Sequence, residues 1–300
     1  MSAADLPQQL RGFDPFGARP LRAYLLLDVF AQQPLEGNQL AVFMDARGLG
    51  GDQMQAVARE LKLAETVFVL PAEQGGDCRV RIFTPATELP FAGHPVLGSA
   101  VAVAGALGAA RVVLETGSGL VTVELAPGTG IARVAEMAQP VPDWKPFAAA
   151  PELLAALGLK RSELPVEEYC NGPRHIMVRL ASEQAVAELD PDLRGLQRVL
   201  GEAGVSCFAG AEGRFKSRMF APGLGVDEDP ATGSAAGPLA VHCCRHGLCA
   251  FGEQIEIRQG AELRRPSLLK ARAEGSAQSV QAVLVGGSAV IVGRGELMLD

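Results

Sequence analysis

A repeated pattern in the two halves of the chain constrains the fold more than any other feature of its 300 residues. The segment 81–85 (RIFTP) in the first half corresponds to 218–222 (RMFAP) in the second. Each is followed by a loop and then by Gly-Ser-Ala, at Gly98 and Gly233, on an apolar stretch typical of a buried helix. The proline-to-serine spacing is 14 residues in the first copy and 12 in the second. The chain is therefore predicted to be an internal duplication that folds into two similar lobes.

Strands and helices are predicted in both halves, which indicates a mixed α and β fold. Alternating or continuous apolar runs predict strands, and apolar residues three and four positions apart predict helices. Strands are expected at 25–30, 40–43, 66–70, 79–83, 175–180 and 215–220, and helices at 51–62, 96–106, 151–157, 192–201 and 233–246. Two further strands, 280–285 and 289–292, are expected to form a hairpin around Gly286 and Gly287.

A proline-rich stretch between residues 140 and 151 is predicted to be the crossover between the lobes. It places the N-terminal lobe at 21–135 and the C-terminal lobe at 136–287, with a last strand at about 288–300 that can join the first lobe. Residues 1–20 are expected to form a loosely ordered leader.

Composition and charge exclude several classes of protein. The net charge is −7 and the basic residues are scattered, which argues against nucleic acid or an anionic membrane as the main partner. No apolar run reaches the roughly 18 residues that span a bilayer, and Asp5, Arg11 and Asp14 interrupt any signal-peptide core. We therefore expect a cytoplasmic protein whose six cysteines are reduced thiols.

The turn at 91–95 (FAGHP) is the first candidate for a functional site. Gly93 allows close approach of the backbone, Pro95 suits the first position of a helix, and the helix start offers free N–H groups to an anion. His94 lies at this edge, where its ring can donate a proton or a hydrogen bond. A histidine that merely caps an ordinary turn is the alternative, and for one turn alone it is the more common case.

The equivalent turn in the second half, 228–234 (EDPATGS), also predicts a helix start. Asp229 precedes a proline and can act as the N-cap, while Gly233 and Ser234 offer a bare amide and a hydroxyl. Simple capping is again the alternative. Two anion-binding helix starts at equivalent places in a duplicated chain predict that both point into one cleft between the lobes.

Glu65 is the third candidate, because it is a lone carboxylate between an apolar helix and an apolar strand. Burial at this position raises the pKa of a carboxyl group toward the range of a general acid/base. An exposed glutamate at the start of a strand is the alternative, and position alone favours it.

Four segments together resemble the phenazine-biosynthesis F (PhzF-like) isomerase family: 65–68 (ETVF), 83–85 (FTP), 91–95 (FAGHP) and 228–235 (EDPATGSA). The match runs in order from about residue 22 to 300. The resemblance implies a diaminopimelate-epimerase-like α+β fold with two pseudo-symmetric lobes. Each lobe would wrap a curved, mostly antiparallel sheet or barrel around a central apolar helix. It also implies isomerisation of trans-2,3-dihydro-3-hydroxyanthranilate without a metal or organic cofactor, and a homodimer.

The resemblance also assigns roles to the candidate residues. Glu65 matches the family's acid/base glutamate, which moves a proton between substrate carbons. The other polar and backbone contacts of the site match Gly93, His94, Asp229, Gly233 and Ser234. Related epimerases use two cysteines as acid and base, but the corresponding turns here contain no cysteine. A two-thiol racemase mechanism is therefore disfavoured.

The segment 242–249 (HCCRHGLC) has the residue types of a metal site, but its spacing argues against one. On a helix His242 and His246 share a face, whereas Cys243 and Cys244 point away from it. Four converging ligands are normally needed, so we expect no metal and interpret the cysteines, including Cys249, as buried small thiols.

The main hypothesis is a cofactor-independent isomerase of a small carboxylate-bearing acid, dihydroaromatic or cyclic, with Glu65 as general acid/base. An amino-acid racemase, an epimerase or a lyase on the same fold would use the same glutamate. A non-catalytic protein that binds small acids is the third reading, although a pure binder needs no acid/base group. The reaction type and the physiological substrate stay open at this point.

Overall fold

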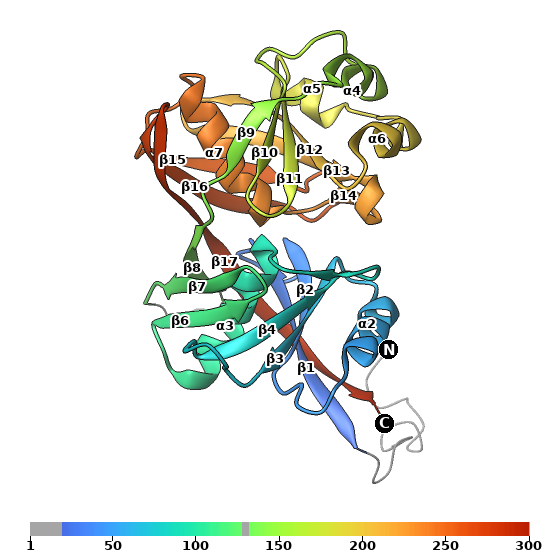
Figure 1. Cartoon of the computed structure of the whole chain (residues 1–300), viewed down its shortest axis with the longest axis vertical. Helices are drawn as coiled ribbons and strands as arrows, with labels where there is room; N and C mark the ends of the chain where they lie inside the picture. Colours follow the sequence, from blue (N-terminus) through green and yellow to red (C-terminus); the bar gives the residue numbers. More distant parts are fainter. Residues whose placement is uncertain (1–19, 128–131, 300) are drawn as a thin grey trace, which may run out of the picture.

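The computed structural model describes residues 20–127 and 132–299, and it consists of two lobes stacked along the long axis (Figure 1). The expected leader lies outside the described residues, apart from Pro20. Within the described part of the chain, no helix has the length and apolar character needed to cross a membrane.

The first lobe is a barrel in which eight strands of the described chain pair in a closed circle. In order around the barrel they are β1 (Leu21–Val29), β2 (Asn38–Phe43), β3 (Glu65–Leu70), β4 (Cys78–Phe83), β6 (Arg111–Thr116), β7 (Gly119–Leu125), β8 (Ala132–Gln139) and β17 (Ser279–Met298). The short β5 (Glu88–Leu89) pairs with β4. Closure leaves this sheet no unpaired edge.

Helix α3 (Gly93–Leu107) lies inside this barrel and is buried from Gly93 to Ala104. Its sequence is apolar on all sides, as expected for a helix that is surrounded by a sheet. Helix α2 (Gly51–Leu61) instead has one apolar face, which packs Met54 and Val57 against Phe43 and Phe68 on the outside of the barrel.

The second lobe wraps a curved sheet around α7 (Gly233–Arg245), with short helices on the outside (Figure 1). Its strands are β9 (Asp143–Pro146), β10 (Glu167–Cys170), β11 (Arg174–Arg179), β12 (Gly204–Ala211), β13 (Arg214–Ala221), β14 (Val226–Asp229), β15 (Gln254–Gln259) and β16 (Ser267–Ser276). The outer elements are α4 (Ala150–Ala156), α5 (Glu183–Ala187), α6 (Leu193–Leu200) and the 3-10 turn η1 (Pro222–Leu224).

The predicted α+β class is confirmed, and most predicted elements match observed ones within a few residues. The two copies of the sequence repeat place Arg81 on β4 and Arg218 on β13, and each strand is followed by the central helix of its lobe. The internal duplication and the lobe boundaries at 135 and 287 stay predictions.

The predicted C-terminal hairpin is wrong, because β17 runs without a break from Ser279 to Met298 and continues through both lobes. Gly286 and Gly287 do not form a turn. They allow close packing instead: a Cβ on Gly287 would lie 2.4 Å from the Phe30 ring, and one on Gly286 would lie 2.9 Å from the carbonyl oxygen of Ala135. Glycine inside a strand often marks such a close approach.

Candidate active site

The starts of the two central helices are in contact between the lobes. Gly93 is the first residue of α3 and Gly233 is the first residue of α7. A Cβ on Gly93 would lie 2.4 Å from the backbone nitrogen of Ser234, and one on Gly233 would lie 3.0 Å from the backbone nitrogen of His94. Only glycine fits at Gly93, since a backbone atom cannot move aside. The positive ends of both helix dipoles therefore meet at one point.

Two details of the predicted turns are wrong. Pro95 is the third residue of α3 rather than the first, although its missing N–H still falls among the four that a helix start leaves unpaired. Asp229 is not the N-cap of α7, because that position belongs to Thr232. Asp229 ends β14 instead, three residues earlier, and its carboxylate bridges Asn38 of the first lobe and the N-cap residue Thr232.

Hydrogen bonds fix the carboxylate of Asp229 on both sides. Its Oδ1 accepts from Asn38 Nδ2 at 2.8 Å, and its Oδ2 accepts from Thr232 Oγ1 at 2.5 Å. From the second lobe, Gln259 Nε2 donates to the carbonyl oxygen of Asp229 at 2.7 Å and to Thr232 Oγ1 at 3.0 Å. The carboxylate thus has one fixed orientation.

Asn38 joins the two lobes and was missed in the sequence analysis. Its Nδ2 lies 3.2 Å from His94 Nδ1 and also donates to the carbonyl oxygen of Ala231 at 3.0 Å. The second lobe holds the preceding residue, because Arg265 Nε donates to the carbonyl oxygen of Gly37 at 2.9 Å. The same arginine forms an ion pair of 2.5 Å with the buried Asp28. An asparagine just after a Gly-containing turn gives no distinctive sequence signal.

Glu65 and His94 meet at the N-terminal side of this contact. Glu65 is the first residue of β3, and its Oε2 lies 3.2 Å from His94 Nε2. The Glu65 side chain is 15% exposed and that of His94 is 4% exposed. The distance is that of an ion pair, but the pKa directions described next favour a neutral contact between a carboxylic acid and an imidazole.

Burial dominates the ionisation of all three titratable groups in the site. It raises the pKa of Glu65 to about 8, and the nearby charge of Asp229 adds to this increase. Burial also lowers the pKa of His94 to about 3, so its ring is neutral at pH 7. The pKa of Asp229 is raised by burial to about 6, although hydrogen bonds from Thr232 and Asn38 oppose this shift. A carboxyl group with a pKa near neutrality can both accept and return a proton.

A groove of about 370 Å³ lies next to this cluster, and it does not include the three titratable groups. Its lining includes Phe30, Lys216, Arg258, Gln259 and Ser267. Of the polar cluster it shares Gln259 alone. The groove thus reaches this cluster at Gln259, which donates to Asp229 and Thr232.

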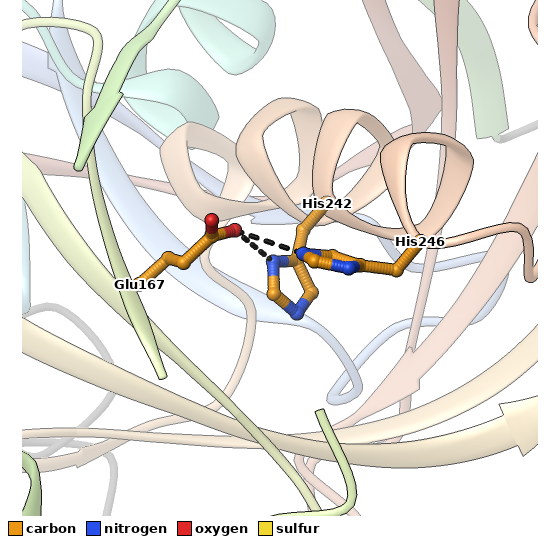
Figure 2. A group of neighbouring side chains, drawn as sticks. All are labelled: Glu167, His242 and His246. Atoms are coloured by element: carbon orange, nitrogen blue, oxygen red, sulfur yellow. Dashed lines mark hydrogen bonds and ion pairs between the residues drawn. The ribbon is translucent and has the colours of Figure 1, made fainter. Parts of the chain in front are cut away.

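The second lobe contains a different polar cluster, which brings Glu167 to His242 of α7 and to its C-cap residue His246 (Figure 2). Glu167 Oε2 lies 3.1 Å from His242 Nδ1 and 3.0 Å from His246 Nε2. The same oxygen accepts from Arg245 Nη1 at 2.8 Å and from Tyr169 Oη at 2.9 Å. A cation at this oxygen would have to displace the arginine. The arrangement fits a network of hydrogen bonds and an ion pair better than a metal site.

The candidate cysteines of this segment lie apart from that cluster. Cys244 Sγ lies 3.1 Å from Cys249 Sγ, while Cys243 is fully buried in the core. The expectation of buried thiols is confirmed for Cys243 and Cys244 but is wrong for Cys249, which is partly exposed. Burial raises the pKa of the Cys243 thiol well above its usual value.

Comparisons with known proteins agree with this geometry. The chain matches the family described as phenazine biosynthesis-like protein (PhzC-PhzF) over residues 27–295. It is 50% identical to trans-2,3-dihydro-3-hydroxyanthranilate isomerase of Pseudomonas chlororaphis, over 92% of this chain and 99% of that protein. Among solved structures, a predicted epimerase from Pseudomonas aeruginosa is 35% identical, with a TM-score of 0.79, over 93% of this chain and 100% of that one.

A probable proline racemase from Agrobacterium radiobacter K84 shares the fold at 12% identity, with a TM-score of 0.68 and coverage of 93% of each chain. Such a low identity supports the two-lobed architecture alone. The match over residues 27–295 decides the family. The chain belongs to the phenazine biosynthesis-like (PhzC-PhzF) family, which confirms the resemblance seen in its four sequence segments.

Proposed function

We propose that this protein is an isomerase that moves a proton between carbon atoms of a small carboxylate-bearing acid, with Glu65 as general acid/base. The observation that carries the proposal is the largely buried carboxyl group of Glu65, which lies 3.2 Å from His94 and whose pKa is raised by burial to about 8. The 50% identity to an isomerase of trans-2,3-dihydro-3-hydroxyanthranilate supports a substrate of that dihydroaromatic type.

In the proposed reaction each residue of the site has a different role. The carboxylate form of Glu65 removes a proton from one substrate carbon, and the resulting carboxylic acid returns it to another. Negative charge that develops on the substrate is stabilised by the helix starts at Gly93 and Gly233. The polar groups of the substrate are held by the neutral ring of His94, by the carboxylate of Asp229 and by the hydroxyl of Ser234. No step requires an electron carrier.

Replacement of Glu65 by glutamine tests this proposal. We expect Glu65→Gln to lower kcat by at least about 10³-fold, because the group that carries the proton is lost, while the dissociation constant of a substrate analogue changes by less than about threefold. Turnover is measured by product formation, and binding by calorimetry with 3-hydroxyanthranilate as the analogue. Glu60→Gln, an exposed helix position, is the matched control. A Glu65→Gln enzyme with full turnover would rule out this role.

An epimerase or racemase on the same glutamate is the second candidate, because a solved relative at 35% identity is described as a predicted epimerase. Turnover in D₂O separates the reactions. An isomerase places the proton on a different carbon, whereas an epimerase returns deuterium to the original carbon with inverted configuration. A lyase would release a second product. Ligand binding without any exchange would leave only a non-catalytic protein.

We further propose a homodimer in the cytoplasm. The support is the sequence resemblance and the free state of the six cysteines in the structure. Sedimentation equilibrium tests the dimer, and fractionation of the native host tests the location. A monomer at micromolar concentration, or recovery outside the cytoplasm, would contradict these two proposals.

A further inference from the structure

Helix α7 contains a proline in its second turn, and this proline leaves one backbone carbonyl without its regular partner. Pro238 lies inside the helix and has no N–H group. In a regular helix the N–H of residue 238 would donate to the carbonyl oxygen of Ser234. Ser234 is buried, so an unpaired carbonyl there would cost free energy.

The missing donor is replaced from outside the helix. Asn171, in the turn between β10 and β11, donates from Nδ2 to the carbonyl oxygen of Ser234 at 2.9 Å. The turn itself is closed by a hydrogen bond of 3.2 Å from the Asn171 backbone nitrogen to the carbonyl oxygen of Pro173. Asn171 is 4% exposed, so water does not compete for this bond.

Gln139, at the end of β8, holds the neighbouring carbonyl. Its Nε2 donates to the carbonyl oxygen of Gly233 at 2.9 Å, and its Oε1 accepts from Asn171 Nδ2 at 3.3 Å. The amide fits because residue 237 is glycine: a Cβ on Gly237 would lie 2.5 Å from Gln139 Oε1. Gly237 thus leaves the space that the Gln139 amide occupies, and Pro238 leaves a carbonyl free to accept from the Asn171 amide.

We infer that Asn171 is a positioning residue of the active site, whose amide replaces the donor that Pro238 lacks and fixes the first turn of α7. This turn carries Gly233 and Ser234, which face Gly93 and His94 across the lobes. The inference rests on the proposed function of that turn in holding the substrate. The orientation of the turn therefore depends on a residue of the β10–β11 turn rather than on the helix alone.

A double substitution tests this inference. Asn171→Ala removes the amide, and we expect kcat/KM to fall roughly tenfold, mostly through KM, since the turn binds the substrate anion before and during the reaction. Pro238→Ala restores a backbone N–H opposite Ser234. In the Asn171→Ala/Pro238→Ala enzyme we therefore expect kcat/KM to return to within about threefold of the Pro238→Ala single variant.

Hydrogen–deuterium exchange of the backbone amides in 233–239 provides a second readout that needs no substrate. Exchange should be faster in Asn171→Ala than in the wild type, and slow again in the double variant. Thermal unfolding of each variant verifies that the chain is folded. If the wild type shows no turnover but the exchange pattern holds, only the proposed function fails.

Two results would overturn the inference. One is a folded Asn171→Ala enzyme with unchanged exchange in 233–239. The other is a double variant whose exchange and kcat/KM stay as impaired as those of Asn171→Ala. The first would mean that Asn171 does not hold the turn. The second would mean that it acts through something other than the carbonyl of Ser234.

Discussion

Each lobe places a glutamate at the start of a strand, beside a histidine of its central helix. The pKa values of the two glutamates are nevertheless shifted in opposite directions. Glu65 begins β3 and lies 3.2 Å from His94, and Glu167 begins β10 and lies 3.1 Å from His242. Burial raises the pKa of Glu65 to about 8. Burial also tends to raise the pKa of Glu167, but hydrogen bonds from its neighbours outweigh it and hold the pKa of that carboxyl well below its usual range.

The difference lies in the number of donors that reach each carboxylate. Glu167 accepts from Tyr169, Arg245 and two histidines, and the arginine brings a full positive charge. Among the described residues, Glu65 has the neutral ring of His94 beside it and the carboxylate of Asp229 nearby, and no cation is paired with it. The same pair of residue types thus forms an ion network in one lobe and, in the function we propose, a proton carrier in the other.

Breaking the ion network should give the largest change in stability. Arg245→Leu leaves Glu167 buried without its cation, and we expect the free energy of unfolding to fall by about 3–5 kcal/mol. Urea unfolding at pH 7 measures this. The matched control is Arg258→Leu, whose ion pair with Glu183 is exposed and should contribute at most about 1 kcal/mol. If both substitutions lowered the free energy of unfolding equally, the buried pair would not contribute more than the exposed one, which would contradict this prediction.

The pH dependence of stability should distinguish the two glutamates by sign. The pKa of Glu65 is raised on folding, so its contribution is complete below about 4.5 and is lost as the pH rises through about 8. Between pH 6 and 8, above the shifted pKa of Asp229, we expect the wild type to lose about 2 kcal/mol that Glu65→Gln does not lose.

The contribution of Glu167 to stability should depend on pH in the opposite direction. Its pKa is lowered on folding, so its contribution is present at neutral pH and is lost as the pH falls below about 4. Glu167→Gln should therefore flatten the acid side of the stability curve and leave the range from pH 6 to 8 unchanged. Urea unfolding of the three proteins from pH 3 to 9 checks both windows. Parallel curves for wild type and Glu65→Gln above pH 6 would contradict the raised pKa.

Removing the charge of Asp229, which lies near Glu65, should give the smallest of these effects, a shift in the pKa of Glu65. Asp229→Asn takes away the repulsion but not the burial, so the pKa of Glu65 should fall and yet stay above its usual value. If the carboxylate form begins the reaction, kcat/KM rises with pH through a midpoint near pH 8, and this midpoint moves to lower pH in the variant. The exposed Asp227→Asn serves as control. A midpoint that does not move would show that Asp229 does not repel Glu65.

Part of this fold, including β1 to β4 and the central helices α3 and α7, could be predicted from the sequence because apolar periodicity reports burial directly. Strands β6 to β8, β12, β15 and β16 were not predicted. The hairpin at Gly286-Gly287 could not, because a glycine that permits close packing looks the same as one that forms a turn. The ionisable candidates Glu65, His94 and Asp229 could be found in short motifs around strand and helix ends.

The amides that hold the site could not be predicted. Asn38, Gln139, Asn171 and Gln259 carry no charge, follow no spacing rule and act on backbone atoms far away in the sequence. Glu167 was missed for a related reason, since 75 residues separate it from His242 and only the fold brings them together.

Glu65 is expected to be a carboxylic acid at neutral pH in the folded protein. Infrared difference spectroscopy between the wild type and Glu65→Gln, titrated from pH 4 to 10, measures this group directly. We expect a carboxylic acid carbonyl band that is present at pH 6 and disappears with a midpoint near pH 8. Loss of that band near pH 4.5, the usual value for a glutamate, would contradict it.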